Sequence, residues 1–413
     1  MSSGNGRVIV VGAGPAGLAC VVELRRRGVA DVLVLDREPH AGGIPRHSGH
    51  QGFGLRDLRR IMSGPRYARH YGELARRAGA DVMTQATVTG WSADGGLEVT
   101  SRGGRETLRA AAVVLATGCR ERPRSARLVP GSRPEGVLTT GTLQQLVELR
   151  RERVGARALI VGAEHVSFSA LLTLAHGGAE AVGMVTELPR HQTLAVFRAG
   201  AALRYRVPLW TRTALGAIHG PSRVEEVELL ELDSGRLRRV ACDTVVFTAD
   251  WIPDHELAVL AGLDIDPGTR GPAVDTGLRT TRPGLFAAGN VLHGAEPADV
   301  AALSGRHAAA SVTRWLTDAA WPAARVSIIC RPPLQWISPN AISAPRDDPP
   351  RGRFLLRATE FLARPVVELY QEGRPLWRER LERIVPGRST LLPTGWISAV
   401  DAHGGPVEIR TQD

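Results

Sequence analysis

Lysine is absent from this sequence of 413 residues, so arginine carries all of the positive charge behind its formal net charge of +10. A basic excess can indicate nucleic-acid binding, but no aromatic residues are interleaved with the arginine clusters, as a base-stacking platform would require. The clusters at 25–27, 150–151 and 378–383 lie in helix-like stretches, where we expect most of them to face solvent. The composition therefore argues against nucleic acid as a partner.

Cysteine is scarce. Its four residues are far apart and form no CxxC pair: Cys20, Cys119, Cys242 and Cys330. This spacing excludes a short-spaced iron–sulfur or zinc site made by this chain alone, so we expect no metal. It also fits a reducing compartment. Cys119, which follows Gly118, is expected to be a small buried residue rather than a nucleophile.

Long apolar runs are also missing. No stretch approaches the roughly 18 residues that a transmembrane helix needs, and the polar first residues run straight into a strand without a signal-peptide pattern. We therefore expect a cytoplasmic protein without a transmembrane segment. With 43% apolar residues, a chain of this length should form two or three domains, each with its own core.

The N-terminal region contains a βαβ pattern. Residues 7–11 form a short apolar strand, GAGPAG follows at 12–17, helical spacing covers 18–27, and a second strand at 32–35 ends at Asp36. This order of strand, glycine-rich turn, helix, strand and acid is the context that makes GxGxxG specific for a dinucleotide.

Each residue of this motif has a physical task. Gly12 allows the tight turn, Gly14 lets the backbone approach a pyrophosphate, and Gly17 lets the helix pack closely on the strand. The start of the helix offers unpaired N–H groups and a positive dipole to phosphate. Asp36 can accept a hydrogen bond from a ribose hydroxyl.

Later segments predict the domain organisation. A second Rossmann-like start lies at 158–162, and after about residue 318 a Pro- and Trp-rich, turn-rich stretch indicates a β-rich domain. We predict an α/β fold with two Rossmann-like domains, the second inserted in the first, and a small β-rich C-terminal domain. The predicted boundaries are 1–125 and 253–320 for the first Rossmann-like domain, 126–252 for the inserted domain and 321–413 for the last.

Two short motifs indicate which dinucleotide the first Rossmann-like domain binds. LATG at 115–118 and FAAGN at 286–290 resemble the second and third FAD-contacting segments of the pyridine nucleotide–disulfide reductase superfamily. The resemblance implies an FAD domain split by an NAD domain. The expected cofactor-binding residues are Gly12, Gly14, Ala16, Gly17, Asp36, Arg37, Gly43, Ala116, Thr117, Gly118, Gly289 and Asn290.

A longer run narrows the resemblance. Residues 116–146, ATGCRERPRSARLVPGSRPEGVLTTGTLQQL, are similar to FAD subunits of opine and proline dehydrogenases, hydrogen cyanide synthase and the sarcosine oxidase large subunit. These subunits work in complexes. The resemblance therefore implies a small-molecule substrate and a partner chain, either a second flavoprotein or an iron–sulfur subunit. Homo-oligomerisation is left open.

The loop after the first acid departs from the superfamily. Disulfide reductases carry two cysteines after a GG pair, whereas GGIPRHSGH at 42–50 places Pro45 and His50 at those positions. The resemblance puts Arg46, His47 and His50 near the flavin as candidate catalytic residues, and His50 could act as an acid or base near neutral pH. The alternative, that these side chains only pack the flavin or the loop, stays open.

Two other segments depart from the pattern. GAEHVSFSA at 162–170 keeps only the first glycine and adds Glu164 beside the expected phosphates, which argues against NAD(P) binding. The third FAD segment ends in Asn290 instead of Asp. Asparagine keeps one acceptor oxygen, so we still expect FAD to be held, with a helix from about Ser304 directing its N-terminus at the flavin.

The leading functional hypothesis is an FAD-dependent dehydrogenase component that uses no redox disulfide. It would oxidise a small amine, amino acid or hydroxy acid, or pass on the resulting electrons. Two alternatives stay open: a stand-alone NAD(P)H-dependent flavin oxidoreductase, and a non-catalytic assembly subunit that binds FAD.

Overall fold

The computed structural model describes residues 6–343 and 347–412, and the chain divides into two compact units. The first contains residues 1–46, 51–119 and 252–413, and the second contains 47–50 and 120–251. The chain leaves the first unit through β10 (Cys119–Glu121) and returns through β19 (Trp251–Pro253). The second unit is thus inserted in the first, while the residue boundaries expected for the individual domains stay a prediction.

The first unit is built on a parallel sheet. Its strands, in spatial order, are β20 (Leu285–Ala287), β9 (Ala112–Leu115), β1 (Val8–Val11), β2 (Val32–Asp36) and β5 (Asp81–Thr84). All four residues of β1 and of β9 are buried, as expected for central strands of a sheet covered on both faces. Strand β1 pairs in register with both of its neighbours, so the carboxyl ends of β1, β2 and β9 meet at one edge.

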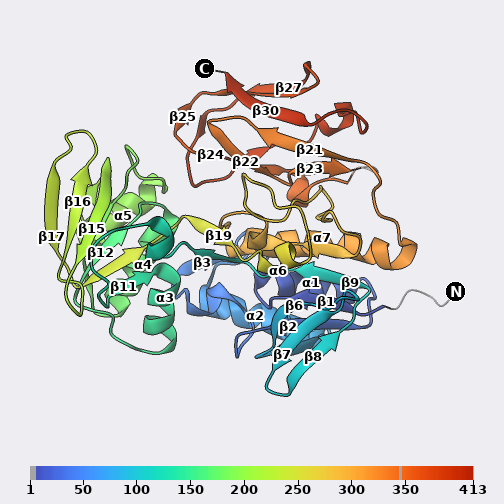
Figure 1. Ribbon diagram of the computed structural model, residues 1–413, viewed down its shortest axis with the longest axis horizontal. Helices are drawn as coiled ribbons and strands as arrows, with labels where there is room; N and C mark the ends of the chain where they lie inside the picture. The colour runs from blue at the N-terminus through green and yellow to red at the C-terminus, as the bar shows by residue number, and fades with distance from the viewer. Residues whose placement is uncertain (1–5, 344–346, 413) are drawn as a thin grey trace. The chain divides into compact units, whose positions relative to one another are not determined.

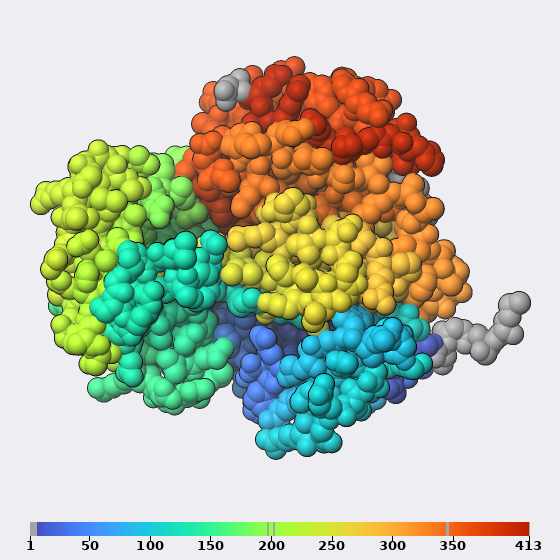
Figure 2. Space-filling model, viewed as in Figure 1, coloured from blue at the N-terminus to red at the C-terminus, as the bar shows by residue number. Residues whose placement is uncertain are grey.

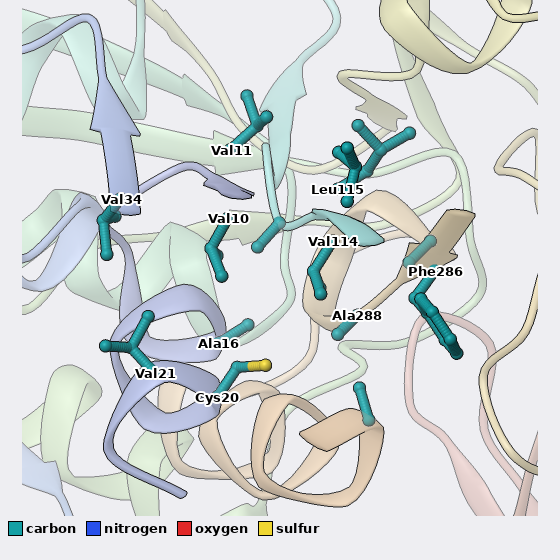
Figure 3. Packing of buried hydrophobic residues seen from close by; sticks show 14 of the residues in the cluster. Val10, Val11, Ala16, Cys20, Val21, Val34, Val114, Leu115, Phe286 and Ala288 are labelled. Atoms are coloured by element: carbon teal, nitrogen blue, oxygen red, sulfur yellow. The ribbon is translucent and has the colours of Figure 1, made fainter. Parts of the chain in front are cut away.

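In the described part of this unit, the α-helices are α1 (Pro15–Arg26), α2 (Gly64–Arg77), α6 (Glu256–Leu260) and α7 (Ala298–Asp318). Helices α1 and α7 lie side by side (Figure 1), and a Cβ added at Gly305 of α7 would come within 1.9 Å of the Ala16 carbonyl oxygen. Figure 3 shows Ala16, Cys20 and Val21 of α1 packed in one core with residues of β1, β2 and β9.

Helix α7 begins at Ala298, so the expected start near Ser304 was wrong by six residues. Pro297 precedes the helix and Asp299 lies in its first turn. Proline ahead of the first turn and an acid within it are both favourable at a helix N-terminus. The small antiparallel elements of the unit are β3 (Gln51–Phe53), β4 (Met62–Ser63), β6 (Thr87–Trp91), β7 (Leu97–Ser101) and β8 (Gly104–Leu108).

The second unit repeats the Rossmann pattern. Its parallel sheet has the order β11 (Val137–Thr139), β18 (Thr244–Phe247), β12 (Arg157–Val161), β13 (Glu180–Val185) and β14 (Leu209–Trp210). Its helices are α3 (Thr140–Gln144), a π-helical turn (Gln145–Leu149), α4 (His165–His176) and α5 (Ala195–Tyr205). An antiparallel sheet completes it: β15 (Thr213–His219), β16 (Glu226–Glu231) and β17 (Leu237–Ala241).

The C-terminal part of the first unit is rich in β-structure, as predicted, and its surface is coloured orange to red in Figure 2. One sheet contains β23 (Ala341–Ser343), β21 (Arg325–Cys330), β30 (Val407–Gln412), β26 (Val366–Gln371) and β27 (Arg374–Arg380). The other strands are β22 (Leu334–Ser338), β24 (Phe354–Ala358), β29 (Thr390–Leu392), β25 (Leu362–Ala363) and β28 (Arg383–Ile384). Trp396 is fully buried and packs on Phe354, with ring centroids 4.9 Å apart.

The arginines at 378–383 lie in strands β27 and β28, so their expected helical setting was wrong. Strand β27 pairs along its length with β26, and this tertiary pairing overrides the local helical preference. None of the described helices combines the length and apolarity needed to cross a bilayer. Within residues 6–343 and 347–412, no three His, Cys, Asp or Glu side chains are grouped as metal ligands.

Candidate functional site

The GAGPAG turn between β1 and α1 leaves open space at one glycine only. Gly12 has a φ of +109°, and a Cβ there would lie 2.4 Å from the Ala116 carbonyl oxygen. A Cβ at Gly17 would lie 1.9 Å from the Gly12 carbonyl oxygen. At Gly14, by contrast, an added Cβ meets no heavy atom within 4 Å. Gly12 and Gly17 are therefore required by the chain itself, whereas Gly14 keeps backbone accessible from outside.

The first turn of α1 has no side-chain cap. Gly14 is its N-cap residue, in extended conformation (φ −79°, ψ −175°), Pro15 occupies the first helical position, and no acidic residue follows in the first turn. The N–H groups at a helix start have no partner within the helix. Uncapped N–H groups beside open space make a site suited to the diphosphate of a dinucleotide.

Asp36 lies at the carboxyl end of β2 beside this turn. Its Oδ2 accepts a hydrogen bond from the Ala13 N–H at 2.6 Å, and its Oδ1 accepts one from the Glu38 N–H at 2.8 Å. Burial raises the pKa of Asp36 above its usual value, and the two backbone hydrogen bonds oppose that shift. The neighbouring Arg37 forms an ion pair with Asp254 at 3.5 Å. The carboxyl group is thus held in place next to the turn, as a ribose acceptor must be.

The LATG segment reaches the same sheet edge. The Ala116 carbonyl lies under Gly12, and the Thr117 hydroxyl donates to the Asp254 carbonyl at 2.7 Å. The Gly118 carbonyl accepts from the Asp254 N–H at 2.9 Å. Asp254 therefore braces this segment and also pairs with Arg37. Asp254 was not predicted from the sequence, because it stands alone in a loop without periodicity.

Gly43 and the FAAGN segment complete the cluster. A Cβ at Gly43 would lie 2.9 Å from the Gly14 Cα, and a Cβ at Gly289 would lie 2.5 Å from the Ala16 Cβ. The Gly289 N–H donates to the Ser304 hydroxyl at 3.0 Å. The structure thus brings the expected cofactor-binding residues of three separate segments to the GAGPAG turn. Their uncapped helix start, open glycine and anchored carboxyl group fit FAD.

Asn290 is used differently from the expected cofactor contact. Its Oδ1 accepts from the Glu296 N–H and its Nδ2 donates to the Glu296 carbonyl, both at 3.1 Å. The side chain therefore closes the loop between β20 and α7. Both polar atoms of the Asn290 side chain are hydrogen-bonded within this loop. The predicted contact of Asn290 with FAD stays a prediction.

The C-terminal β-structure holds this same loop. The Arg357 guanidinium donates to the Glu296 carboxylate at 2.8 Å and to the Ala295 carbonyl at 2.7 Å. The Arg357 and Glu296 side chains are 8% and 9% exposed, so the pair is almost fully desolvated. His293 stacks on Trp336, with ring centroids 5.0 Å apart, and burial lowers the pKa of His293. A small, mostly apolar cavity beside the loop is lined by both parts of the unit.

The candidate catalytic residues contact different partners. Arg46 donates to the His40 carbonyl at 2.7 Å and lies 3.7 Å from the Glu38 carboxylate. His47 is buried in the second unit, where its Nδ1 lies 3.3 Å from the Gln144 Oε1. His50 is half-buried in that same unit. Gln144, which the sequence analysis missed, also accepts a hydrogen bond from Ser48 and donates one to Ser169.

Two known proteins match more than two thirds of this chain. An opine oxidase subunit from Agrobacterium tumefaciens is 27% identical over 337 residues, which cover 73% of this chain and 64% of that protein. This chain therefore spans less than two thirds of that relative. Thioredoxin reductase of Treponema pallidum is 28% identical over 301 residues, covering 69% of this chain and 88% of the relative.

Among solved structures, the thioredoxin reductase of T. acidophilum superposes with a TM-score of 0.62 at 20% identity, over 75% of this chain and 98% of that one. Residues 6–305 match the family described as pyridine nucleotide-disulphide oxidoreductase. The match covers the Rossmann units and the start of α7, and the β-rich part beyond Arg325 lies outside it. The chain belongs to this family of FAD-dependent oxidoreductases.

Proposed function

We propose that this chain is an FAD-dependent dehydrogenase component that works without a redox disulfide. Its substrate is a small amine, amino acid or hydroxy acid, which it oxidises itself or whose electrons it passes on. One observation carries the proposal: the dinucleotide turn at 12–17 is complete, while the loop at 42–50, where related disulfide reductases keep their dithiol, contains no cysteine.

The residues described above have defined tasks in this function. Gly14 and the uncapped start of α1 would hold the diphosphate of FAD, and Asp36 would hold a ribose. Gly43 and the segments 116–118 and 289–290 would line the rest of the cofactor. Bound FAD supplies a two-electron acceptor. Arg46, His47 and His50 are the side chains that we assign to the substrate side, with His50 as the proton acceptor.

The cysteines elsewhere in the chain give no support to thiol chemistry. Burial raises the pKa of Cys20 to about 12 and that of Cys242 to about 11, so both thiols stay protonated at neutral pH. Burial also raises the pKa of Cys330, and Cys119 is 6% exposed. A protonated thiol is a poor nucleophile toward a disulfide.

A partner chain is part of the proposal. The relative from A. tumefaciens is named as one subunit of an opine oxidase, and a separate chain would take electrons that this one cannot relay through cysteines. We propose a second flavoprotein or an iron–sulfur chain as that partner, in a cytoplasmic and therefore reducing setting.

The test is to reduce the FAD-loaded protein under anaerobic conditions. The reduction is measured as the loss of flavin absorbance. Amines, amino acids, hydroxy acids, NADH and NADPH are tried in turn, first on the wild type and then on a variant with all four cysteines changed to Ser. We expect an organic donor to bleach both proteins at similar rates. Loss of reduction in a folded, FAD-loaded cysteine-free variant would show that a thiol is needed and would refute the proposal.

His50 is tested in the same assay. If His50 accepts a proton from the substrate, His50→Gln lowers the rate of flavin reduction at saturating substrate. His70→Gln, which changes a histidine on α2 that is half-buried like His50, is the control. A reduction rate of His50→Gln equal to that of the wild type would assign His50 to packing.

A further inference from the structure

The chain contains two copies of the strand–turn–helix start, so one can be compared with the other. In the first unit α1 begins after Gly14, with φ −79° and ψ −175° at the N-cap. In the second unit α4 begins after Glu164, with φ −99° and ψ −175° at its N-cap. Counted from the first glycine of each turn, Gly12 and Gly162, these are the same position. The backbone conformations at the two N-cap positions are similar, and the two residues differ in their side chains.

The Glu164 side chain satisfies the start of its own helix. Its carboxylate accepts a hydrogen bond from the backbone N–H of Ser167, the third residue of α4, and the Ser167 hydroxyl accepts one from the Glu164 N–H at 3.3 Å. This reciprocal capping box uses N–H groups that a bound phosphate would need. At the equivalent place in the first unit, the start of α1 has no side-chain cap.

The turn behind Glu164 is filled as well. The Ser167 hydroxyl donates to the Glu164 Oε2 at 2.7 Å and lies 2.7 Å from the Thr248 hydroxyl oxygen. A Cβ added at Gly162 would lie 1.9 Å from that Thr248 oxygen. Side-chain atoms of Ser167, Thr248 and Glu164 thus lie against Gly162, whereas only backbone atoms lie this close to the equivalent Gly12.

The local charge is also unfavourable for phosphate. Glu164 and Glu121 are each 7% exposed, and each has one carboxylate oxygen that is buried without a hydrogen-bond partner among the described residues. The nearby Arg127 guanidinium donates to the carbonyls of Thr248 and Ala249, both at 2.8 Å. These guanidinium donors are therefore engaged with the backbone, and the buried Glu164 carboxylate opposes an approaching anion.

We propose that the Glu164 carboxylate is the resident anion of the α4 N-terminus and the residue that excludes dinucleotide phosphates from the inserted domain. It occupies the place that a diphosphate takes in a working Rossmann unit, and because it is part of the chain it competes with phosphate as an intramolecular ligand. The inserted domain is then a scaffold closed to NADH and NADPH, and a reductant of another chemical class must serve the flavin. The inference concerns binding to the second unit and does not depend on which substrate the flavin oxidises.

The test is to restore the glycine that the first unit carries. NADPH and NADH are titrated into the FAD-loaded full chain by isothermal calorimetry, with wild type, Glu164→Gly, and Glu164→Gln as the neutral variant that keeps an acceptor. Glu152→Gln, which changes an exposed acid of the same unit, is the matched control. Circular dichroism and the FAD content confirm that each variant is folded.

We expect no saturation by either dinucleotide up to millimolar concentration in the wild type and in Glu152→Gln. Glu164→Gly should gain at least about tenfold in affinity because backbone N–H groups and space are freed and a charge is removed, with a smaller gain for Glu164→Gln. Micromolar binding to the wild type, or folded Glu164 variants that bind no better than the wild type, would overturn the proposal. If Glu164→Gly does not fold, the same criteria apply to Glu164→Gln.

Discussion

Glu121 offers a direct test of the electrostatics of the inserted unit. Its Oε2 accepts the Gly141 N–H at 2.7 Å, while its Oε1 is buried without a hydrogen-bond partner in the described part of the chain. Burial is the main cause that raises the pKa of this carboxyl group to about 7, and the Glu164 carboxylate adds to the shift. We predict that replacing Glu121 with Gln stabilises the second unit at alkaline pH.

The sign and the size follow from linkage. An unfolded chain releases this proton near pH 4.5, whereas the folded unit keeps it up to about pH 7. Between these values the folded state binds more protons, so stability falls as pH rises through the window. A shift of this size corresponds to roughly 3 kcal/mol above pH 7, and Glu121→Gln, which cannot ionise, should lack that loss. At pH 4.5 the variant and the wild type should be nearly equally stable.

The measurement is hydrogen exchange of peptides from β12 and β18, corrected for intrinsic exchange rates, between pH 4.5 and 8.5. It reports the opening free energy of the second unit without mixing in the first. Glu225→Gln, which changes an exposed acid of the same unit, is the control and should follow the wild type. Opening free energies that stay parallel for wild type and Glu121→Gln across the range would refute the reasoning.

Two further predictions concern the first unit. Gly14→Val should fold, because an added Cβ there meets nothing within 4 Å, but the purified variant should show no FAD absorbance. Gly12→Val should instead lower the melting temperature, because its Cβ would lie 2.4 Å from the Ala116 carbonyl oxygen. FAD retained by Gly14→Val would contradict the prediction for that variant. Arg357→Met leaves the Glu296 carboxylate buried without its cation and should lower the unfolding free energy by about 3 kcal/mol, with recovery on adding Glu296→Gln. Thermal unfolding tests this prediction. An unchanged melting temperature for Arg357→Met would show that the Arg357–Glu296 pair is not needed for stability.

Local patterns determined the first Rossmann unit from the sequence alone. The strand, turn, helix and acid at residues 7–36 are contiguous, and Gly12 and Gly17 have steric tasks that a residue with a Cβ atom cannot perform. The helix-capping residue Glu164 could be located in the same way, because an N-cap acts on its own first turn. Contiguous, short-range interactions are the ones that a sequence displays directly.

Tertiary structure alone decided the rest. The partner of His47 is Gln144, 97 residues away, and Arg357 reaches Glu296 across 61 residues. The burial that perturbs Glu121 comes from a fold in which its neighbours are Gly141 and Glu164. Residues 378–380 form a strand because β26 pairs with them, and Arg383 lies in a strand because Ala363 of β25 pairs with it. Burial, and pairing between segments far apart in the chain, depend on packing in three dimensions, and no local spacing of residue types specifies them.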